Sequence, residues 1–299
     1  MADVRLLDRA SRLRTGRTPF VLATVVRAER PTSARPGDQA LVLADGTMEG
    51  FVGGSCAEST TRAESLRVLT SGEAGLLRIT PGGGTQPAPP GVRVVDNPCL
   101  SGGALDIFLE PVLPPALVLV RGESPVARAL VRLGGALDHD VQLVDDPAAP
   151  LPVDTAAVVV ASHGQDEEEV LAAALTAGVP YVALVASRQR AAGVLAAVAA
   201  REVLGVERVH APAGLDIGAR TPGEIALSVF AQIVALRSAP ATDAMPQPRP
   251  APVIDPVCGM EVLPVAPTPS ASDPEQGTVW FCGPGCRTAY LADPRGFRS

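Results

Sequence analysis

The 299-residue sequence contains no lysine, so arginine supplies every permanently basic side chain. The formal net charge at pH 7 is −7, and no stretch of the chain is strongly basic. Proteins that bind nucleic acid usually present basic patches to the phosphates. This charge balance therefore argues against a nucleic-acid partner.

Long apolar runs are also missing, since no stretch approaches the ~18 apolar residues of a membrane-spanning helix. The N-terminus lacks the basic-then-apolar layout of a signal peptide. We therefore expect a cytoplasmic protein without an integral membrane segment, in which the cysteines stay reduced. Aromatic residues make up only 3% of the chain, so its cores must be built from aliphatic side chains.

The central motif is Gly-Gly-Ser-Cys-Ala-Glu, which lies between a strand-like run over 47–52 and a helix-like run over 57–69. Two glycines allow a sharp turn, and a cysteine in the first turn of a helix has its thiolate stabilised by the helix dipole. A buried, inert cysteine is the alternative. The candidate binding residues here are Gly53, Gly54, Ser55, Cys56 and Glu58.

A second glycine-rich cysteine stretch spans 97–103, and its candidate residues are Cys99, Gly102 and Gly103. Strands are predicted at 20–28, 40–44, 47–52, 76–80, 92–95 and 104–110, with helices at 3–14 and 57–70. This mixture predicts an α+β domain over 1–112. We expect its two cysteine loops to form two walls of one pocket.

Residues 115–237 have a different pattern, in which short apolar strands alternate with helices. Strands are predicted at 116–120, 141–144, 156–161 and 181–186, and helices at 125–137, 166–177 and 189–200. The Thr221–Glu224 capping box predicts the start of a further helix. Such alternation is typical of a doubly wound, Rossmann-like parallel sheet.

The glycine fingerprint expected after the first of these strands is degraded, since only Gly122 remains and Ser124 and Pro125 follow it. Asp145 occupies the position of a ribose-binding acid. Because the fingerprint depends on glycines for close approach to pyrophosphate, we expect weak or absent NAD(P) binding. The other candidate binding residues are expected beside the crevice or in the long loop after 209, and are His163, Ser187, Arg188 and Asp216.

A Pro/Ala-rich linker is predicted over 238–254, followed by a small cysteine-bearing module over 255–299. Three cysteines, Cys258, Cys282 and Cys286, form a pattern suited to a soft metal such as copper or zinc. Met260 offers a thioether as a fourth ligand. The alternative is that the module merely packs its cysteines.

With these motifs in place, the chain resembles the XdhC/CoxI family with a YHS domain appended. The similarity rests on GGSCAE at 53–58, CLSGGALDIFLEP at 99–111 and VHAPAGLDIGARTPGEIALS at 209–228. DPVCGM and FCGPGC resemble YHS modules, which are thought to bind heavy metals such as copper or zinc.

The resemblance implies an accessory factor rather than an enzyme. Such a factor would bind molybdenum cofactor, protect it during sulfuration and deliver it to an apo molybdenum hydroxylase of the xanthine dehydrogenase or carbon monoxide dehydrogenase type. A sulfur-donating cysteine desulfurase and a second copy of the chain are further candidate partners. Two alternatives remain open, an NAD(P)-dependent oxidoreductase and a copper- or zinc-handling or metal-sensing protein that acts through its C-terminal module.

Overall fold

The structure is a computed structural model that describes residues 4–81, 89–96, 103–238 and 251–297. The chain divides into two compact units. The first comprises Met1–Pro114 together with Gln247–Ser299, and the second comprises Pro115–Pro246. The mixed α/β architecture predicted from the sequence is confirmed, including the parallel sheet of the second unit.

The first unit is built on a six-stranded sheet with the order β3-β2-β1-β6-β4-β5. All neighbouring pairs are antiparallel except β4 and β5. The strands are β1 (Phe20–Glu29), β2 (Gln39–Leu43), β3 (Met48–Gly50), β4 (Gly75–Thr80), β5 (Val92–Asp96) and β6 (Ala104–Val112).

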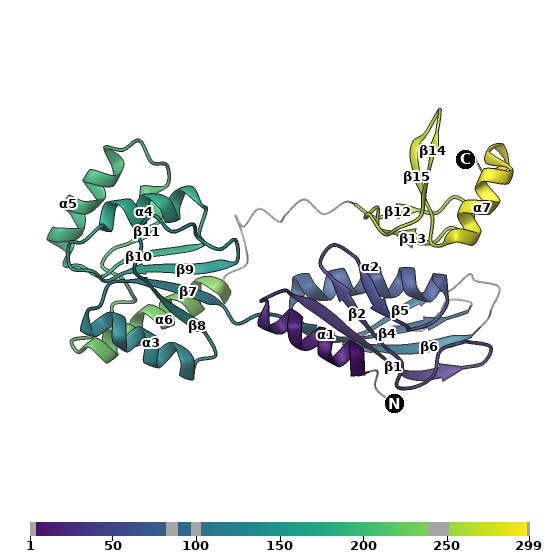
Figure 1. The fold of residues 1–299 in the computed structure, drawn as a ribbon, viewed down its shortest axis with the longest axis horizontal. Helices are drawn as coiled ribbons and strands as arrows, with labels where there is room; N and C mark the ends of the chain where they lie inside the picture. Colours follow the sequence, from purple (N-terminus) through teal and green to yellow (C-terminus); the bar gives the residue numbers. More distant parts are fainter. Residues whose placement is uncertain (1–3, 82–88, 97–102, 239–250, 298–299) are drawn as a thin grey trace. The chain divides into compact units, whose positions relative to one another are not determined.

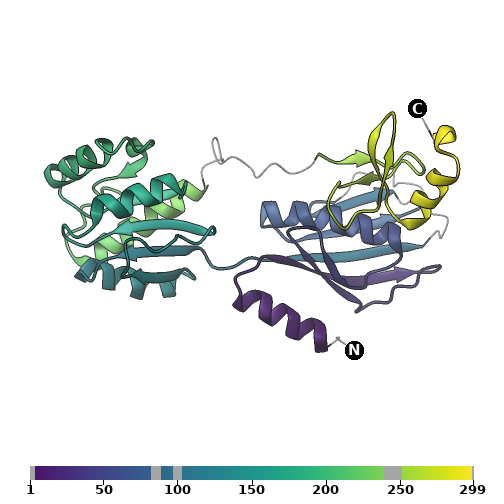
Figure 2. The same ribbon diagram turned by 45° about the horizontal axis from the view of Figure 1, so that its top comes forward.

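Two helices cover opposite faces of this sheet (Figures 1 and 2). Helix α2 (Ser55–Ser71) packs on the face where Val21, Leu77 and Ile107 form the larger core. Helix α1 (Val4–Thr15) lies on the other face, where Leu6 and Leu13 meet the side chains of β1 and β2. Side chains along each strand point alternately to the two faces of the sheet, so apolar side chains on both faces need helices to cover them.

The C-terminal module belongs to the same unit and consists of two small hairpins and a helix. Its elements are β12 (Val253–Ile254), β13 (Glu261–Val262), β14 (Ser270–Asp273), β15 (Gly277–Trp280), α7 (Pro284–Ala292) and η2 (Pro294–Phe297). The predicted linker over 238–254 extends too far, because Val253 and Ile254 pair with β13. Strand β13 contacts α2, so the module packs on the side of the six-stranded sheet that α2 covers.

The second unit contains a five-stranded parallel sheet with the order β11-β10-β9-β7-β8. Its strands are β7 (Leu117–Arg121), β8 (Asp140–Val144), β9 (Thr155–Val160), β10 (Tyr181–Leu184) and β11 (Val209–His210). In chain order this is 2-1-3-4-5, the flavodoxin-like variant of the doubly wound sheet. The short strand β11 lies where the sequence predicted the start of a loop.

Helices flank both faces of this sheet, which explains the continuous apolar runs of its strands. Helices α3 (Pro125–Ala136) and α6 (Pro222–Ser238) pack together on one face, and α4 (Glu167–Thr176) and α5 (Arg188–Ala199) on the other. A single 3-10 turn, η1 (Val206–Arg208), precedes β11. None of the helices in the described parts of the chain is both long and apolar enough to cross a membrane.

Candidate functional site

The glycine–cysteine motif forms the turn that opens helix α2. Gly53 has a φ of 140°, which an L-residue rarely adopts, and Gly54 is the N-cap of the helix. Cys56 therefore lies in the first helical turn, as predicted, where the helix dipole favours a thiolate. Glu58 pairs with Arg62 at 2.8 Å, one turn along the helix. This carboxylate thus has a structural partner within α2.

The three cysteines of the C-terminal module converge on one point. The Sγ atoms of Cys258 and Cys282 are 3.6 Å apart, and those of Cys282 and Cys286 are 3.5 Å apart. Ligand atoms from these three residues and Asp255 all lie within 4.8 Å of one another. The structure therefore brings together the three residues that the sequence predicted as metal ligands.

Asp255, which was not among the residues predicted from the sequence, is completely buried beside these thiols. One carboxylate oxygen accepts a hydrogen bond from the Cys282 N–H at 2.7 Å, and the other accepts from the Val257 N–H at 2.9 Å. Both oxygens are thus engaged by the backbone of the loops that carry Cys258 and Cys282. Asp255 fixes the positions of these cysteines. Its place in the Asp-Pro-Val-Cys turn was the available signal, because aspartate commonly caps such turns.

The thiols influence one another's protonation. The hydrogen bond shared with Cys282 lowers the pKa of Cys258 and raises the pKa of the Cys282 thiol. Burial raises the pKa of Cys286 to about 12. Several thiolates packed together repel one another, whereas a bound cation would favour their deprotonation. The chemistry of this cluster therefore suits a thiophilic metal ion.

Cys56 lies beside this cluster, although it comes from the N-terminal part of the chain and is not among the four residues whose ligand atoms all lie within 4.8 Å of one another. Its side chain hydrogen-bonds with Cys282 and packs with a small apolar group that includes Met260 and Val262. The module is held here by further contacts with α2. An ion pair joins Arg67 to Glu261 at 3.1 Å, across 194 positions of the sequence.

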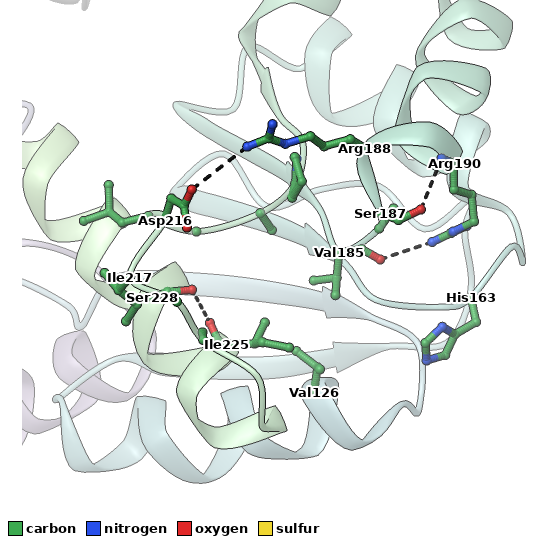
Figure 3. Close-up of a pocket in the computed structure, with 17 residues that line it drawn as sticks. Val126, His163, Val185, Ser187, Arg188, Arg190, Asp216, Ile217, Ile225 and Ser228 are labelled. Atoms are coloured by element: carbon green, nitrogen blue, oxygen red, sulfur yellow. Dashed lines mark hydrogen bonds and ion pairs between the residues drawn. The ribbon is translucent and has the colours of Figure 1, made fainter.

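A separate pocket of about 600 Å³ lies in the second unit, at the carboxyl ends of β9, β10 and β11. Three of the predicted site residues on these loops, His163, Ser187 and Arg188, line it together with Asp216 (Figure 3). Its volume is typical of a small-molecule site, and its position is the usual one in open α/β sheets. No cysteine is among the described residues that line it.

Two arginines give the pocket different electrostatic features. Arg190 is held by buried Glu167 at 2.6 Å and by the Val185 carbonyl at 3.1 Å, so its charge is compensated. Arg188 reaches Asp216 only at 4.0 Å, and both side chains are largely exposed to solvent. An exposed pair at this distance contributes little, so the Arg188 charge can serve an anionic ligand.

Two predicted residues, Gly122 and Asp145, are not among those that line the pocket. A Cβ on Gly122 would lie 2.6 Å from the carbonyl oxygen of Ala161, so this glycine serves the close approach of the β7 turn to β9. Ser124 caps α3 by accepting a hydrogen bond from the Ala127 N–H at 3.1 Å. Gly122 and Ser124, at the turn where a dinucleotide would bind, therefore make contacts within the protein instead.

The second cysteine loop falls largely outside the described residues, and both Cys99 and Gly102 lie there. Gly103 is described and buried. A Cβ at this position would lie 2.2 Å from the Pro31 carbonyl oxygen, so the glycine allows two backbone segments to pass closely. The predicted pairing of two cysteine loops into one pocket therefore stays a prediction.

A polar network that no sequence motif indicated lies beneath the pocket loop. Gln232 accepts hydrogen bonds from the Tyr181 hydroxyl at 2.8 Å and from the Gly214 N–H at 3.0 Å. His210 stacks on Tyr181 with ring centroids 4.9 Å apart, and burial lowers the pKa of its imidazole. These contacts anchor the loop that carries Asp216. A glutamine within a helix gives no local signal of this role.

The parallel sheet of the second unit, with a pocket at the carboxyl ends of its strands, defines a Rossmann-type domain. A family model described as the XdhC Rossmann domain matches residues 118–233, and a second, described as the XdhC and CoxI family, matches residues 13–80. The chain belongs to the XdhC/CoxI family, as its resemblance predicted.

Individual relatives are more distant. The chain is 28% identical over 263 residues to the uncharacterized protein YqeB of Escherichia coli K12, covering 79% of this chain and 47% of that protein. It thus spans about half the length of this relative. A crystal structure described as a xanthine dehydrogenase from Bacillus halodurans compares with a TM-score of 0.38 at 18% identity, covering 82% of this chain and 98% of that one.

Proposed function

We propose that this protein is an accessory factor that binds molybdenum cofactor in the pocket of its second unit and delivers it to an apo molybdenum hydroxylase. Membership of the XdhC/CoxI family supports a general role in the maturation of xanthine dehydrogenase. The observation that carries the more specific proposal is the pocket at the carboxyl ends of β9–β11, with the N-terminus of α5 and Arg188 at its edge.

The residues present fit the chemical groups of the cofactor, which is a phosphate-bearing pterin dithiolene. The first N–H groups of a helix lack partners within the helix and attract anions, and Ser187 and Arg188 lie at this end of α5. Val126, Val185 and Ile217 offer apolar surface to a flat ring. When bound, the cofactor supplies the dithiolene that holds molybdenum. The protein's residues bind the phosphate and shield the ring from water.

The pocket gives no support to sulfur transfer by its own residues, since its described lining contains no cysteine. Protection of the cofactor during sulfuration, with a cysteine desulfurase as the sulfur donor, is therefore the more distant part of the proposal. Carbon monoxide dehydrogenase is an alternative client to xanthine dehydrogenase. A homodimer is compatible with each of these roles.

The test uses the full chain, produced in a host that makes the cofactor. Pterin and molybdenum per chain are measured for the wild type, for Arg188→Ala and for Arg201→Ala. Arg201 is an exposed arginine of the same unit outside the pocket lining, and it serves as the control. Hydrogen bonds to charged groups contribute about 1.5–3 kcal/mol, so Arg188→Ala should weaken retention about 10- to 150-fold.

Equal cofactor content in all three proteins would refute the assignment of the pocket. Co-purification of a nicotinamide nucleotide in place of the pterin would instead support the oxidoreductase alternative. Micromolar NAD binding corresponds to about −8 kcal/mol. The occupied turn around Gly122 and Ser124 argues against such affinity.

A second function, metal binding by the YHS-like module, is favoured by the convergence of its three cysteines. We propose that Cys258, Cys282 and Cys286 bind one copper or zinc ion. Replacing all three by serine should abolish thiol-dependent metal binding by the full chain under reducing conditions. Unchanged metal content in this variant would refute the proposal.

A further inference from the structure

Resting on the metal-binding function proposed above, we propose that Cys56 is the fourth ligand of the site formed by Cys258, Cys282 and Cys286. A single thiophilic ion, Zn²⁺ in the first instance, would then tie the C-terminal module to the glycine–cysteine turn of helix α2. This site joins the two most distinctive cysteine motifs of the chain.

Two of the thiol separations are close to those of a tetrahedral thiolate site. Zinc binds thiolate sulfur at about 2.3 Å, so two ligands of a tetrahedral ion lie roughly 3.8 Å apart. The observed Sγ separations are 3.6 Å for Cys258 and Cys282 and 3.5 Å for Cys282 and Cys286. Small outward movements of the side chains would therefore admit the ion.

The module by itself supplies three thiols, whereas structural zinc sites are closed by four protein ligands. Cys56 is in hydrogen-bonding contact with Cys282 and packs against the apolar residues around it, although its Sγ is not within 4.8 Å of every ligand atom of the group. A small movement of this side chain would bring a fourth thiol to the site. Four thiolates form the donor set that selects zinc over harder ions such as magnesium or calcium.

The local electrostatics favour a thiolate-rich site. Cys56 lies in the first turn of α2, and Cys286 lies in the first turn of α7. The starts of the two helices meet closely, because a Cβ on Gly283 would lie 2.7 Å from the Cβ of Ser55. Two helix N-termini thus converge on the cluster, and their dipoles offset part of the negative charge of four thiolates.

Two other residues compete for the fourth position. Both carboxylate oxygens of Asp255 already accept backbone hydrogen bonds, and aspartate is a harder ligand than thiolate. Met260 is buried in the same cluster and carries a thioether, which is uncharged. A thiolate from Cys56 is the stronger ligand for Zn²⁺, so Cys56 is favoured over both.

The site has a consequence for Cys56 itself. With the ion bound, the Cys56 sulfur is coordinated and covered by the module, so it cannot react with other molecules. When the ion leaves, the Cys56 sulfur is no longer coordinated, although contacts such as Arg67 with Glu261 still hold the module on α2. Metal occupancy would thereby control the reactivity of Cys56.

The first experiment measures the affinity of the full chain for Zn²⁺ under reducing, anaerobic conditions, by competition with a chromophoric chelator. Loss of a group that merely supports a ligand already costs about 10- to 100-fold in affinity. We therefore expect Cys56→Ser to weaken binding by roughly 100-fold or more and Met260→Leu to change it little. Circular dichroism checks that both variants remain folded.

The second experiment counts the thiolates directly. With Co²⁺ in place of zinc, the sulfur-to-metal charge-transfer absorption per bound ion should fall in Cys56→Ser in proportion to the loss of one thiolate. Zn²⁺ should also protect Cys56 from alkylation in the wild type but not in the Cys258/Cys282/Cys286 triple serine variant. Peptide mass spectrometry identifies the modified cysteine.

The proposal is overturned if Cys56→Ser binds Zn²⁺ as tightly as the wild type, or if its cobalt spectrum is unchanged. It is also overturned if Met260→Leu, and not Cys56→Ser, weakens the site. Titration with Cu⁺ alone provides a separate arm. If the wild type and Cys56→Ser bind Cu⁺ equally tightly, and the wild type does not retain Zn²⁺, the site belongs to the module alone.

Discussion

Replacement of Gly283 by alanine should push the start of α7 away from the start of helix α2 without altering any cysteine. Gly283 has an extended backbone with a φ of −170°, so alanine brings no backbone strain. The added Cβ would, however, lie 2.7 Å from the Cβ of Ser55, where ordinary contacts are 3.4–4 Å. The start of α7 must therefore move by about 1 Å away from the start of α2.

The size of the effect follows from this overlap. Inserting a methyl group into a well-packed contact typically costs about 1–3 kcal/mol. If metal binding requires the docked arrangement, this cost appears as a loss of Zn²⁺ affinity of about 5- to 150-fold. The loss cannot exceed that of Cys56→Ser, because complete separation only removes the fourth ligand.

The assay is the chelator competition with Zn²⁺, and the chain offers a matched control and a rescue. A Cβ at Gly285, two residues further along, would meet nothing within 4 Å, so Gly285→Ala should leave the affinity unchanged. Ser55→Gly removes the Cβ that collides with the new methyl group. The double variant Ser55→Gly/Gly283→Ala should therefore recover most of the lost affinity.

The reasoning is refuted if Gly283→Ala and Gly285→Ala behave alike, or if Ser55→Gly fails to rescue Gly283→Ala while the module stays folded. Either result would mean that contact between the two helix starts does not control the metal site. Folding of the module is followed by the fluorescence of Trp280, the single tryptophan of the chain.

Three further predictions concern the second unit. Gly122→Ala should destabilise this unit by about 2–5 kcal/mol in thermal or denaturant unfolding, because the residue has a φ of 107° and its new Cβ would clash with the Ala161 carbonyl oxygen. As a control, Gly135→Ala at an exposed position of α3 should stabilise the unit by up to about 1 kcal/mol. Thr221→Ala should cost about 1 kcal/mol in the same measurement, because α6 loses its N-terminal cap. Hydrogen bonds from the backbone N–H groups of Thr221 and Arg220 lower the pKa of Glu224. The stability that Glu224 contributes should therefore be present above the ordinary glutamate pKa of 4.5 and lost as the pH falls through the lower pKa of the folded state. Burial lowers the pKa of His210, so the stability that neutral His210 contributes should be present above pH 6.5 and lost as the pH falls towards the lower pKa of the folded state. The melting temperature of the wild type should therefore decline over this pH range. The same decline in His210→Gln would contradict this prediction.

Much of the fold could be predicted from local sequence. The apolar runs at 116–120 and 156–161 predicted buried parallel strands, since strands covered on both faces need no alternation. The Gly-Gly turn and the helix after it placed Cys56 in a first helical turn, which the structure confirms. Capping boxes and glycines act within a few residues, so the chain carries these signals locally.

The site residues were predictable to the same extent. Spacing identified Cys258, Cys282 and Cys286 as a group, because two of them form a Cys-x3-Cys pattern that enters a helix. Likewise His163, Ser187 and Arg188 could be placed at one edge of a sheet, because parallel strands end on the same side. The surrounding structure then decided which candidates line the pocket and which, like Gly122, serve the fold.

Only the tertiary structure placed Cys56 beside the cysteines of the module. The two motifs are far apart in the sequence, and periodic patterns say which face of an element is buried but not which distant element covers it. That pairing depends on non-local contacts such as Arg67 with Glu261 and on a close approach that Gly283 permits. The physical reason is that docking is selected by the fit of two folded surfaces, and this fit exists only after both have formed.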